Sequence, residues 1–136
     1  MEVKKIEIFV EKDKEGMYWG TTQNFVGVVS SCGNTFEELK SNLEGAFADN
    51  IEIAKEFGED YANDYEDVEF VYKMDLSSFF ALIPEVKISS VAKKAGLNES
   101  LVRQYKNGIA TASQEQAYKI QNAIHQLGKE LLAVQF

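Results

Sequence analysis

Residues 88–107 read ISSVAKKAGLNESLVRQYKN, and three of them stand at the spacing of two short helices joined by a tight turn. The small side chain of Ala92 lets a second helix approach the first closely. Gly96 lacks a Cβ atom and therefore accepts the positive φ that a sharp turn requires. Val102 is placed to fill the angle between the two helices. The stretch predicts a helix, a turn at Gly96 and a second helix.

The second helix of this pair has a predicted beginning, an outward face and an end. Asn98 is a preferred N-cap residue and is also counted among the residues expected to bind DNA, and the pair Asn107-Gly108 suits the point where a helix stops. The residues that point away from the apolar interior are polar or charged: Glu99, Ser100, Arg103, Gln104 and Lys106. A short helix with such a face is the element that enters the major groove in helix-turn-helix proteins.

Two residues on that face are candidates for reading bases. Arginine can make a bidentate contact with guanine and glutamine with adenine, so Arg103 and Gln104 are expected to contact bases unless they are merely solvated. Glu99 leaves two roles open, acceptance of a hydrogen bond from cytosine or, as favoured here, stabilisation of its own helix N-terminus. Three further residues suit phosphate oxygens, which set the register on DNA: Ser100, Lys106 and Asn107.

The charge of the chain is divided unevenly along its length. Residues 1–75 contain seven lysines, no arginine and 18 Asp and Glu residues, a formal charge of −11. Residues 76–136 contain seven Lys and Arg against four Asp and Glu, a formal charge of +3. Because a polyanion is attracted only by the second part, the asymmetry indicates two modules with different partners. The alternative is that the first part simply has an ordinary solvated acidic surface.

The acidic part begins with the pattern of a β-meander. Apolar and polar residues alternate over 4–11, which predicts a half-buried strand. Residues 18–22 predict a second strand and 26–31, rich in β-branched residues, a third, with antiparallel pairing. A capping box at Thr35 then predicts a long helix that ends at Gly58.

The remaining pattern completes an α+β fold of two domains. Residues 59–67 are acidic and predict a solvated loop, and alternation over 68–74 predicts a fourth strand. A small antiparallel βββαβ domain is therefore expected over 1–75, followed by an all-α domain over 76–136. Its last helix is expected to begin at Ser113 and to reach about Leu132.

The composition argues against several classes of protein. The single cysteine, Cys32, cannot form an internal disulfide, and with the single histidine, His125, it provides no zinc site, so no metal and no cofactor is expected. The chain has no apolar run of about 18 residues and no signal-peptide pattern, which predicts a cytoplasmic protein that does not bind membranes. The carboxylates at 59–67 lie in an expected loop, so we do not expect an enzyme.

Several stretches of the sequence resemble those of a known family. Residues 88–109 look like the phage-repressor class of helix-turn-helix, including the Asn-Gly pair that ends its recognition helix. The whole chain resembles the HicB-like antitoxins, in which a βββαβ module similar to part of a ribonuclease H fold precedes a DNA-binding domain. The resemblance rests on four short motifs: Tyr18-Trp19-Gly20, Gly33-Asn34-Thr35, Glu37-Glu38 and Ile120-Gln121-Asn122-Ala123. One departure is Phe25-Val26-Gly27, where many members have a proline before the glycine.

The resemblance implies a function with two parts. Members of the family commonly neutralise a small basic toxin that cleaves messenger RNA and repress their own operon, so double-stranded operator DNA and such a toxin are the implied partners. Repressors of this type usually act as homodimers or larger oligomers. The sheet edges, or the last helix with Leu131, Leu132, Val134 and Phe136, are the candidate interfaces. Two alternatives stay open: a stand-alone regulator whose first domain only dimerises or senses, and an interaction module with a vestigial DNA domain.

Overall fold

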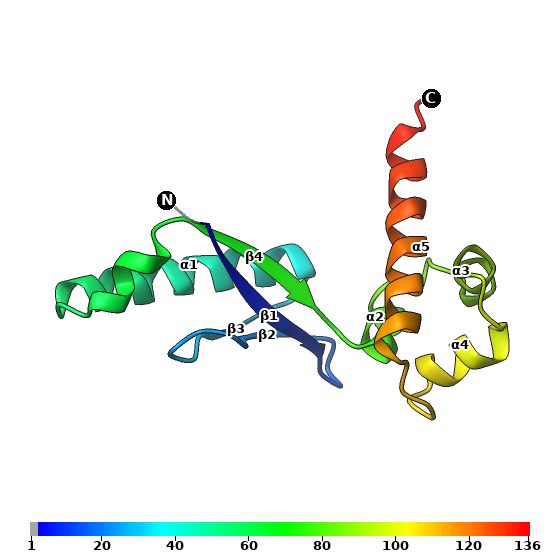
Figure 1. The fold of residues 1–136 in the computed structure, drawn as a ribbon, viewed down its shortest axis with the longest axis horizontal. Coiled ribbons are helices and arrows are strands. Elements are labelled where there is room, and N and C mark those ends of the chain that lie inside the picture. Colours follow the sequence, from blue (N-terminus) through cyan, green and yellow to red (C-terminus); the bar gives the residue numbers. More distant parts are fainter. Residues whose placement is uncertain (1–2) are drawn as a thin grey trace. The chain divides into compact units, whose positions relative to one another are not determined.

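A computed structural model describes residues 3–136, and the chain divides into two compact units, Met1–Met74 and Asp75–Phe136. The fold is α+β, with one four-stranded mixed sheet and several helices (Figure 1). The predicted boundary lay after Asp75. In the structure Asp75 is the N-cap of helix α2 (Leu76–Leu82), so this residue belongs with the second unit.

The first unit contains the sheet, in the order β3-β2-β1-β4. Its strands are β1 (Lys4–Lys12), β2 (Tyr18–Thr22), β3 (Ser30–Gly33) and β4 (Val68–Lys73). β2 is antiparallel to β1 and β3, but β4 is parallel to β1, so the expectation of an antiparallel sheet was wrong. The reason is topological. The helix α1 (Phe36–Glu56) carries the chain back after β3, and the next strand therefore runs in the direction of β1.

The third strand lies further along the chain than predicted, because tertiary contacts rather than β-propensity place it. Val26 and Val28 are 69% and 77% exposed in the loop before β3. Val29 is buried, and its amide donates to Thr22 Oγ1 at 3.0 Å. Pairing with β2 then occupies Ser30–Gly33.

Helix α1 packs on one face of the sheet, and both of its ends are as the sequence predicts. The Thr35 side chain accepts a hydrogen bond from the Glu38 amide at 3.0 Å, and Gly58 follows the helix with φ of 73°. The core comprises alternate residues of β1 and one stripe of α1: Ile6, Ile8, Val10, Leu39, Leu43, Phe47, Ile51 and Ala54. This arrangement buries the apolar face of the predicted first strand.

The acidic segment after α1 contains a short 3₁₀ helix, η1 (Asp60–Tyr65), where a loop was expected. Aromatic packing explains it, since the ring of Phe25 lies 5.0 Å from that of Tyr65 and 4.9 Å from that of Phe47. The segment is therefore held on the core of the first unit, while its carboxylates remain on the surface.

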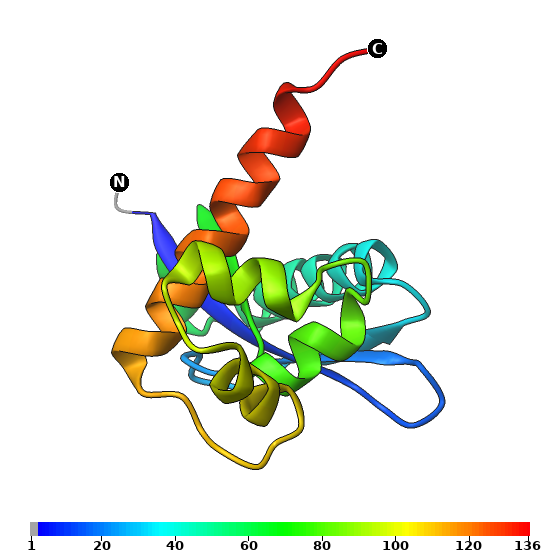
Figure 2. The ribbon, with the colours of Figure 1, turned by 90° about the vertical axis from the view of Figure 1, so that its right-hand side faces the viewer.

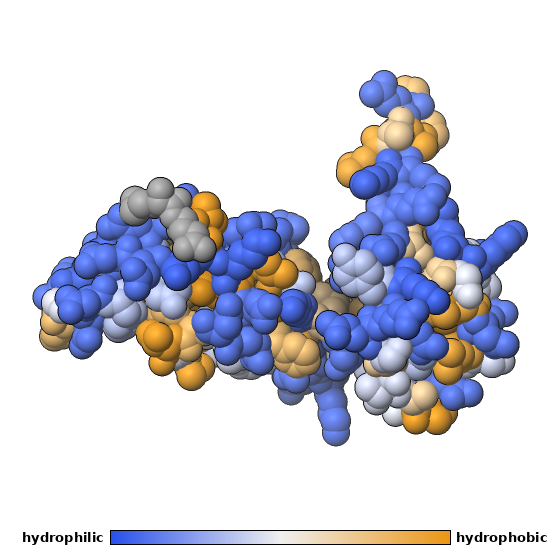
Figure 3. All heavy atoms as spheres, in the orientation of Figure 1, coloured by the Kyte–Doolittle hydropathy of each residue, from blue (hydrophilic) through white to orange (hydrophobic). Residues whose placement is uncertain are grey.

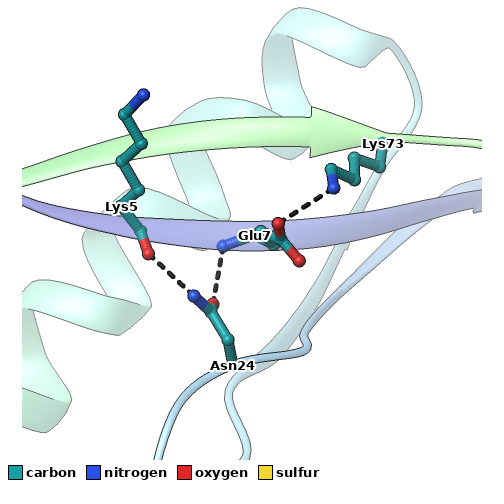
Figure 4. Close-up of polar contacts among 4 residues, drawn as sticks. All are labelled: Lys5, Glu7, Asn24 and Lys73. Atoms are coloured by element: carbon teal, nitrogen blue, oxygen red, sulfur yellow. Dashed lines mark hydrogen bonds and ion pairs between the residues drawn. The ribbon is translucent and has the colours of Figure 1, made fainter. Parts of the chain in front are cut away.

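Polar contacts hold the loop after β2 against β1 (Figure 4). The Asn24 side chain accepts from the Glu7 amide at 2.8 Å and donates to the Lys5 carbonyl at 2.9 Å. On the neighbouring strand, Lys73 Nζ lies 2.9 Å from Glu7 Oε1. The two hydrogen bonds of Asn24 substitute for strand pairing beyond the end of β2.

The second unit is helical, with α2, α3 (Ile88–Ala95), α4 (Glu99–Lys106) and α5 (Gln114–Ala133). The Asp75 carboxylate caps α2 and accepts from the Ser78 amide at 2.7 Å and the Ser77 hydroxyl at 2.8 Å. Partial desolvation opposes ionisation of Asp75, but these hydrogen bonds outweigh it and hold the pKa of the carboxyl below its usual value. None of the helices described is long and apolar enough to cross a membrane.

Candidate nucleic-acid interface

Helix α3 ends where the sequence predicts a tight turn. Gly96 is in the left-handed region, with φ of 70° and ψ of 30°. The Leu97 amide donates to the Ala92 carbonyl at 2.9 Å, and the Gly96 amide donates to the Lys93 carbonyl at 3.2 Å. These two bonds are those of a Schellman turn, in which a residue without Cβ is favoured. The chain therefore leaves α3 sharply and begins α4 three residues later.

Helix α4 begins at the predicted cap. The Asn98 side-chain oxygen accepts a hydrogen bond from the Ser100 amide at 2.8 Å, and the Val102 amide donates to the Asn98 carbonyl at 3.2 Å. Glu99 is in the first turn, where its negative charge interacts favourably with the helix dipole. Asn107 and Gly108, the latter with φ of 72°, end the helix. Asn98 is therefore committed to capping, although it remains exposed.

The interior of the helix pair fixes which side of α4 faces outward. Ala92 is 2% exposed and Val102 is completely buried. Tyr105, one turn after Val102, is also buried, and its hydroxyl donates to the Gln116 side chain on α5. The sequence analysis did not assign Tyr105, although its spacing from Val102 places it on the same side of the helix. These residues join Phe80 and Ile120 in the core of the second unit.

All seven residues predicted to bind DNA are exposed on or beside α4. At 100° per residue, the outward face lies opposite Val102 and Tyr105 and is centred near Ser100, with Arg103 and Gln104 on either side of that residue. Ser100, Arg103, Gln104 and Asn107 lie on this face. Glu99 and Lys106 lie at its edge, and Asn98 precedes the helix as its cap. The fold therefore brings the predicted site residues together on one surface.

An ion pair within the helix lies on that surface. Arg103 Nη2 lies 2.8 Å from Glu99 Oε1, and the two side chains are 57% and 46% exposed. An exposed pair at i,i+4 contributes only about 0.3–0.5 kcal/mol, so a ligand can compete for the guanidinium at small cost. Glu99 holds the arginine against the helix and reduces the net charge of the face.

The cations near α4 are not equally available. Lys94, at the end of α3, is paired with Glu130 on α5, with Nζ and Oε2 3.0 Å apart. Lys93 and Lys106 are exposed. The positive charge available beside α4 is therefore small, and tight binding to a polyanion would need more than one copy of this surface.

The other residues considered for catalysis or metal binding lie on different elements. Cys32 is partly buried on β3 and His125 is exposed on α5. The acidic segment around η1 places Glu66 Oε1 3.1 Å from Lys55 Nζ. Within residues 3–136, no group of three or more His, Cys, Asp and Glu side chains is arranged to hold a metal ion.

Comparison with known proteins does not assign the chain to a family. No family model, curated protein or solved structure matches the chain.

Proposed function

We propose that the chain is a DNA-binding antitoxin and transcriptional autorepressor of a HicAB-like type II toxin-antitoxin system, acting in the cytoplasm. In this proposal the second unit is a helix-turn-helix domain of the phage-repressor type. The first unit is a HicB-like acidic βββαβ domain that binds a small basic RNA-cleaving toxin. The observation that carries the proposal is the exposure of Arg103 and Gln104 on the face of α4 opposite buried Val102.

The dimensions of α4 suit the major groove. An α-helix with its side chains is about 10–12 Å in diameter, and the major groove of B-DNA is about 12 Å wide. With eight residues, α4 is about 12 Å long, enough for two turns of the helix to lie in the groove. Its short polar residues, Ser100 and Asn107, allow the backbone to approach the phosphates. Binding would replace the exposed ion pair of Arg103 with Glu99 by a bidentate contact to guanine.

The proposal is tested by a gel shift with DNA from upstream of the chain's own gene, at about 50 mM and about 200 mM salt. We expect a shift that weakens steeply at the higher salt. We expect Arg103→Ala to weaken binding roughly 5- to 150-fold, the effect of about 1–3 kcal/mol lost at one base contact.

The matched control is Lys129→Ala, which removes one cation from the far half of α5 in the same unit. It should leave the binding constant nearly unchanged. Absence of a salt-dependent shift with the natural chain would reject the DNA-binding proposal, and equal losses in the two variants would reject base reading by Arg103.

The antitoxin part of the proposal is supported by the surface of the first unit. This unit, Met1–Met74, contains seven lysines against 17 Asp and Glu residues, a formal charge of −10, and exposes Val26 and Val28 in one loop. A basic protein would be attracted by the charge and could bury the apolar loop. The test is co-purification of the full chain with the product of a neighbouring reading frame for a small basic protein. Failure to form a complex would reject this part alone.

A stand-alone regulator is the second candidate, and the open face of the sheet favours it. Phe9, Trp19 and Val71 lie on the side of the sheet opposite Ile8, and Trp19 is 43% exposed. Such a face could mediate dimerisation or bind a signal molecule. This candidate predicts that the DNA shift persists while no basic partner co-purifies.

A further inference from the structure

The sheet of the first unit has two edge strands, and the structure treats them differently. At the β3 edge, the Cys32 carbonyl accepts a hydrogen bond from Asn42 Nδ2 of α1 at 2.9 Å. At the other edge, β4 pairs with β1 alone, and no further strand within residues 3–136 adjoins it. An unpaired edge strand is a template for another strand. The β4 edge is therefore the open side of the sheet.

The pairing of β4 with β1 determines which of its backbone groups face outward. The residues of a strand direct their N–H and C=O groups alternately to its two sides. The Asp67 carbonyl accepts from the Lys4 amide at 3.1 Å, so the alternate residues that follow Asp67 also face β1. Val68, Phe70 and Tyr72 therefore direct their amides and carbonyls to the free edge, where none of these groups has a partner among the described residues.

The features that usually protect an edge strand are missing from this side of β4. Its register with β1 continues without a bulge, and the single proline of the chain, Pro84, is not in the strand. Glu69 and Lys73 are charged, but they alternate with the residues that contact α1 and so project from the opposite face of the sheet. Lys73 is also paired with Glu7. The edge is therefore open to a pairing strand.

A groove lies beside this edge, between β4 and α1. Its volume is about 490 Å³, within the range of about 300–1,000 Å³ that is typical of ligand sites. Phe47, Ile51 and Phe70 supply apolar surface, and the small, exposed side chain of Ala48 leaves the helix side low. The ribbon views show α1 along one face of the sheet (Figures 1 and 2). Every second side chain of a strand added to β4 would point to that face and enter the groove.

The charge around the groove favours a basic occupant. Four carboxylates line it, those of Glu44, Glu52, Glu66 and Asp67, and its one lysine, Lys55, is already paired with Glu66 at 3.1 Å. The unit has a formal charge of −10, and the space-filling view shows a mostly hydrophilic surface on it (Figure 3). Nucleic acid or a second copy of this unit would be repelled here, whereas lysine and arginine side chains would be attracted.

We propose that an extended, lysine- or arginine-containing segment of a partner protein adds to the sheet as a fifth strand along the outer edge of β4. Its backbone pairs with Val68, Phe70 and Tyr72, its apolar side chains contact Phe47 and Phe70, and its cationic groups reach the acidic rim. In strand addition, main-chain hydrogen bonds supply affinity and the adjacent groove selects side chains. The inference goes beyond the proposed function and does not rest on it, because this ligand is defined by its backbone and charge alone.

The test is fluorescence anisotropy of a labelled peptide of alternating lysine and valine, acetyl-KVKVKVK-amide, titrated with about 1 to about 500 μM of the full chain. The natural chain should bind the peptide saturably. Two further peptides carry N-methyl groups, one on its valines and the other on its lysines. Only one edge of the peptide can meet β4, so one methylated peptide should lose about tenfold or more in affinity and the other should not.

Variants of the chain test the groove separately from the edge. Ala48→Trp fills the groove from an exposed position without changing the charge, and it should weaken binding about tenfold. The matched control is Ile53→Trp, on the same helix but outside the groove, where Ile53 is 52% exposed. It should bind as the natural chain does.

A pair of charge reversals tests the acidic rim. Glu52→Lys, in the groove, should weaken binding roughly two- to fivefold. Glu15→Lys makes the same change in the turn before β2 and should have little effect. Circular dichroism checks that each variant retains its fold. Equal losses in the two reversals would show attraction to the whole unit and would overturn the assignment of the groove.

Hydrogen exchange followed by NMR locates the contact. The amides of Val68, Phe70 and Tyr72 should exchange quickly in the free chain and slowly with the unmethylated peptide, whereas those of Glu69 and Val71 should be protected in both states. Edge amides that stay unprotected, or equal binding of the two methylated peptides, would overturn the inference.

Two further outcomes separate this inference from its alternatives. Protection of the edge amides that rises with chain concentration in the absence of peptide would assign the edge to a second copy and would also overturn the inference. The Ala48→Trp chain should still shift DNA as the natural chain does, because the substitution lies in the first unit. Failure of DNA binding and failure of peptide binding are therefore distinguishable.

Discussion

The two units of the chain bury their apolar residues in different ways and carry opposite charge. The first packs one long helix on a sheet and contains most of the aromatic contacts, including those of Phe25 with Phe47 and Tyr65. The second is made of short helices around Val102 and Ile120. Residues 1–75 have a formal charge of −11 and residues 76–136 one of +3. Because each unit has its own hydrophobic core, the two units can differ in charge and in free energy of unfolding.

The largest expected effect comes from placing a charge in the second core. Val102 is completely buried between α3 and α4, so Val102→Asp should destabilise that unit by about 4 kcal/mol or more and unfold it. In a two-dimensional NMR spectrum of the full chain, residues 75–136 should show the narrow amide chemical-shift dispersion of an unfolded segment. The residues of the sheet should keep their native chemical shifts. Leu43→Asp should produce the reverse. Loss of both units in either variant would show that the two cores fold as one.

Alanine substitutions at two glycines of the first unit compare a tightly packed position with an open one. A Cβ atom on Gly33 would lie 2.5 Å from the Leu39 amide nitrogen, so Gly33→Ala should destabilise by about 1–3 kcal/mol or more. Gly45 is inside α1 with nothing within 4 Å of a built Cβ, and Gly45→Ala should stabilise by about 0.5–1 kcal/mol. Urea denaturation measures both. Equal effects of the same sign would contradict the close approach at Gly33.

The capping residue at the start of the second unit gives a smaller effect that depends on pH. Asp75→Ala should cost about 1 kcal/mol at pH 7, because the Ser78 amide loses its acceptor. The pKa of Asp75 is lowered in the folded state, so its contribution is complete above the unfolded value and is lost as pH falls through the folded value. The difference in urea midpoint between the two chains should therefore shrink below about pH 4. A difference that is constant down to pH 2 would argue against the ionised cap.

Local signals in the sequence predicted much of the candidate site. Thr35, Gly58, Gly96 and Asn98 each act within one helical turn, and the structure places each at the expected cap or turn. The exposure of Arg103 follows from the period of the helix once Val102 is assigned to the interior.

Features that depend on distant contacts were not predictable in this way. The parallel pairing of β4 with β1 depends on the return of the chain through α1. The exposure of Val26 and Val28 shows that β-branched residues form no strand where no partner is in register. The hydrogen bond that the Tyr105 hydroxyl donates to Gln116 joins α4 to α5, and neither segment alone predicts it.

The sequence by itself therefore determined α1, α3, α4 and α5, their caps, the turn at Gly96 and the division of charge, because each depends on neighbours within a few residues or on composition alone. The tertiary structure decided which strands pair, where β3 begins and how much of α5 its own unit covers. Those outcomes depend on contacts between segments far apart in the chain. Their free energy belongs to the packed core and to no single segment.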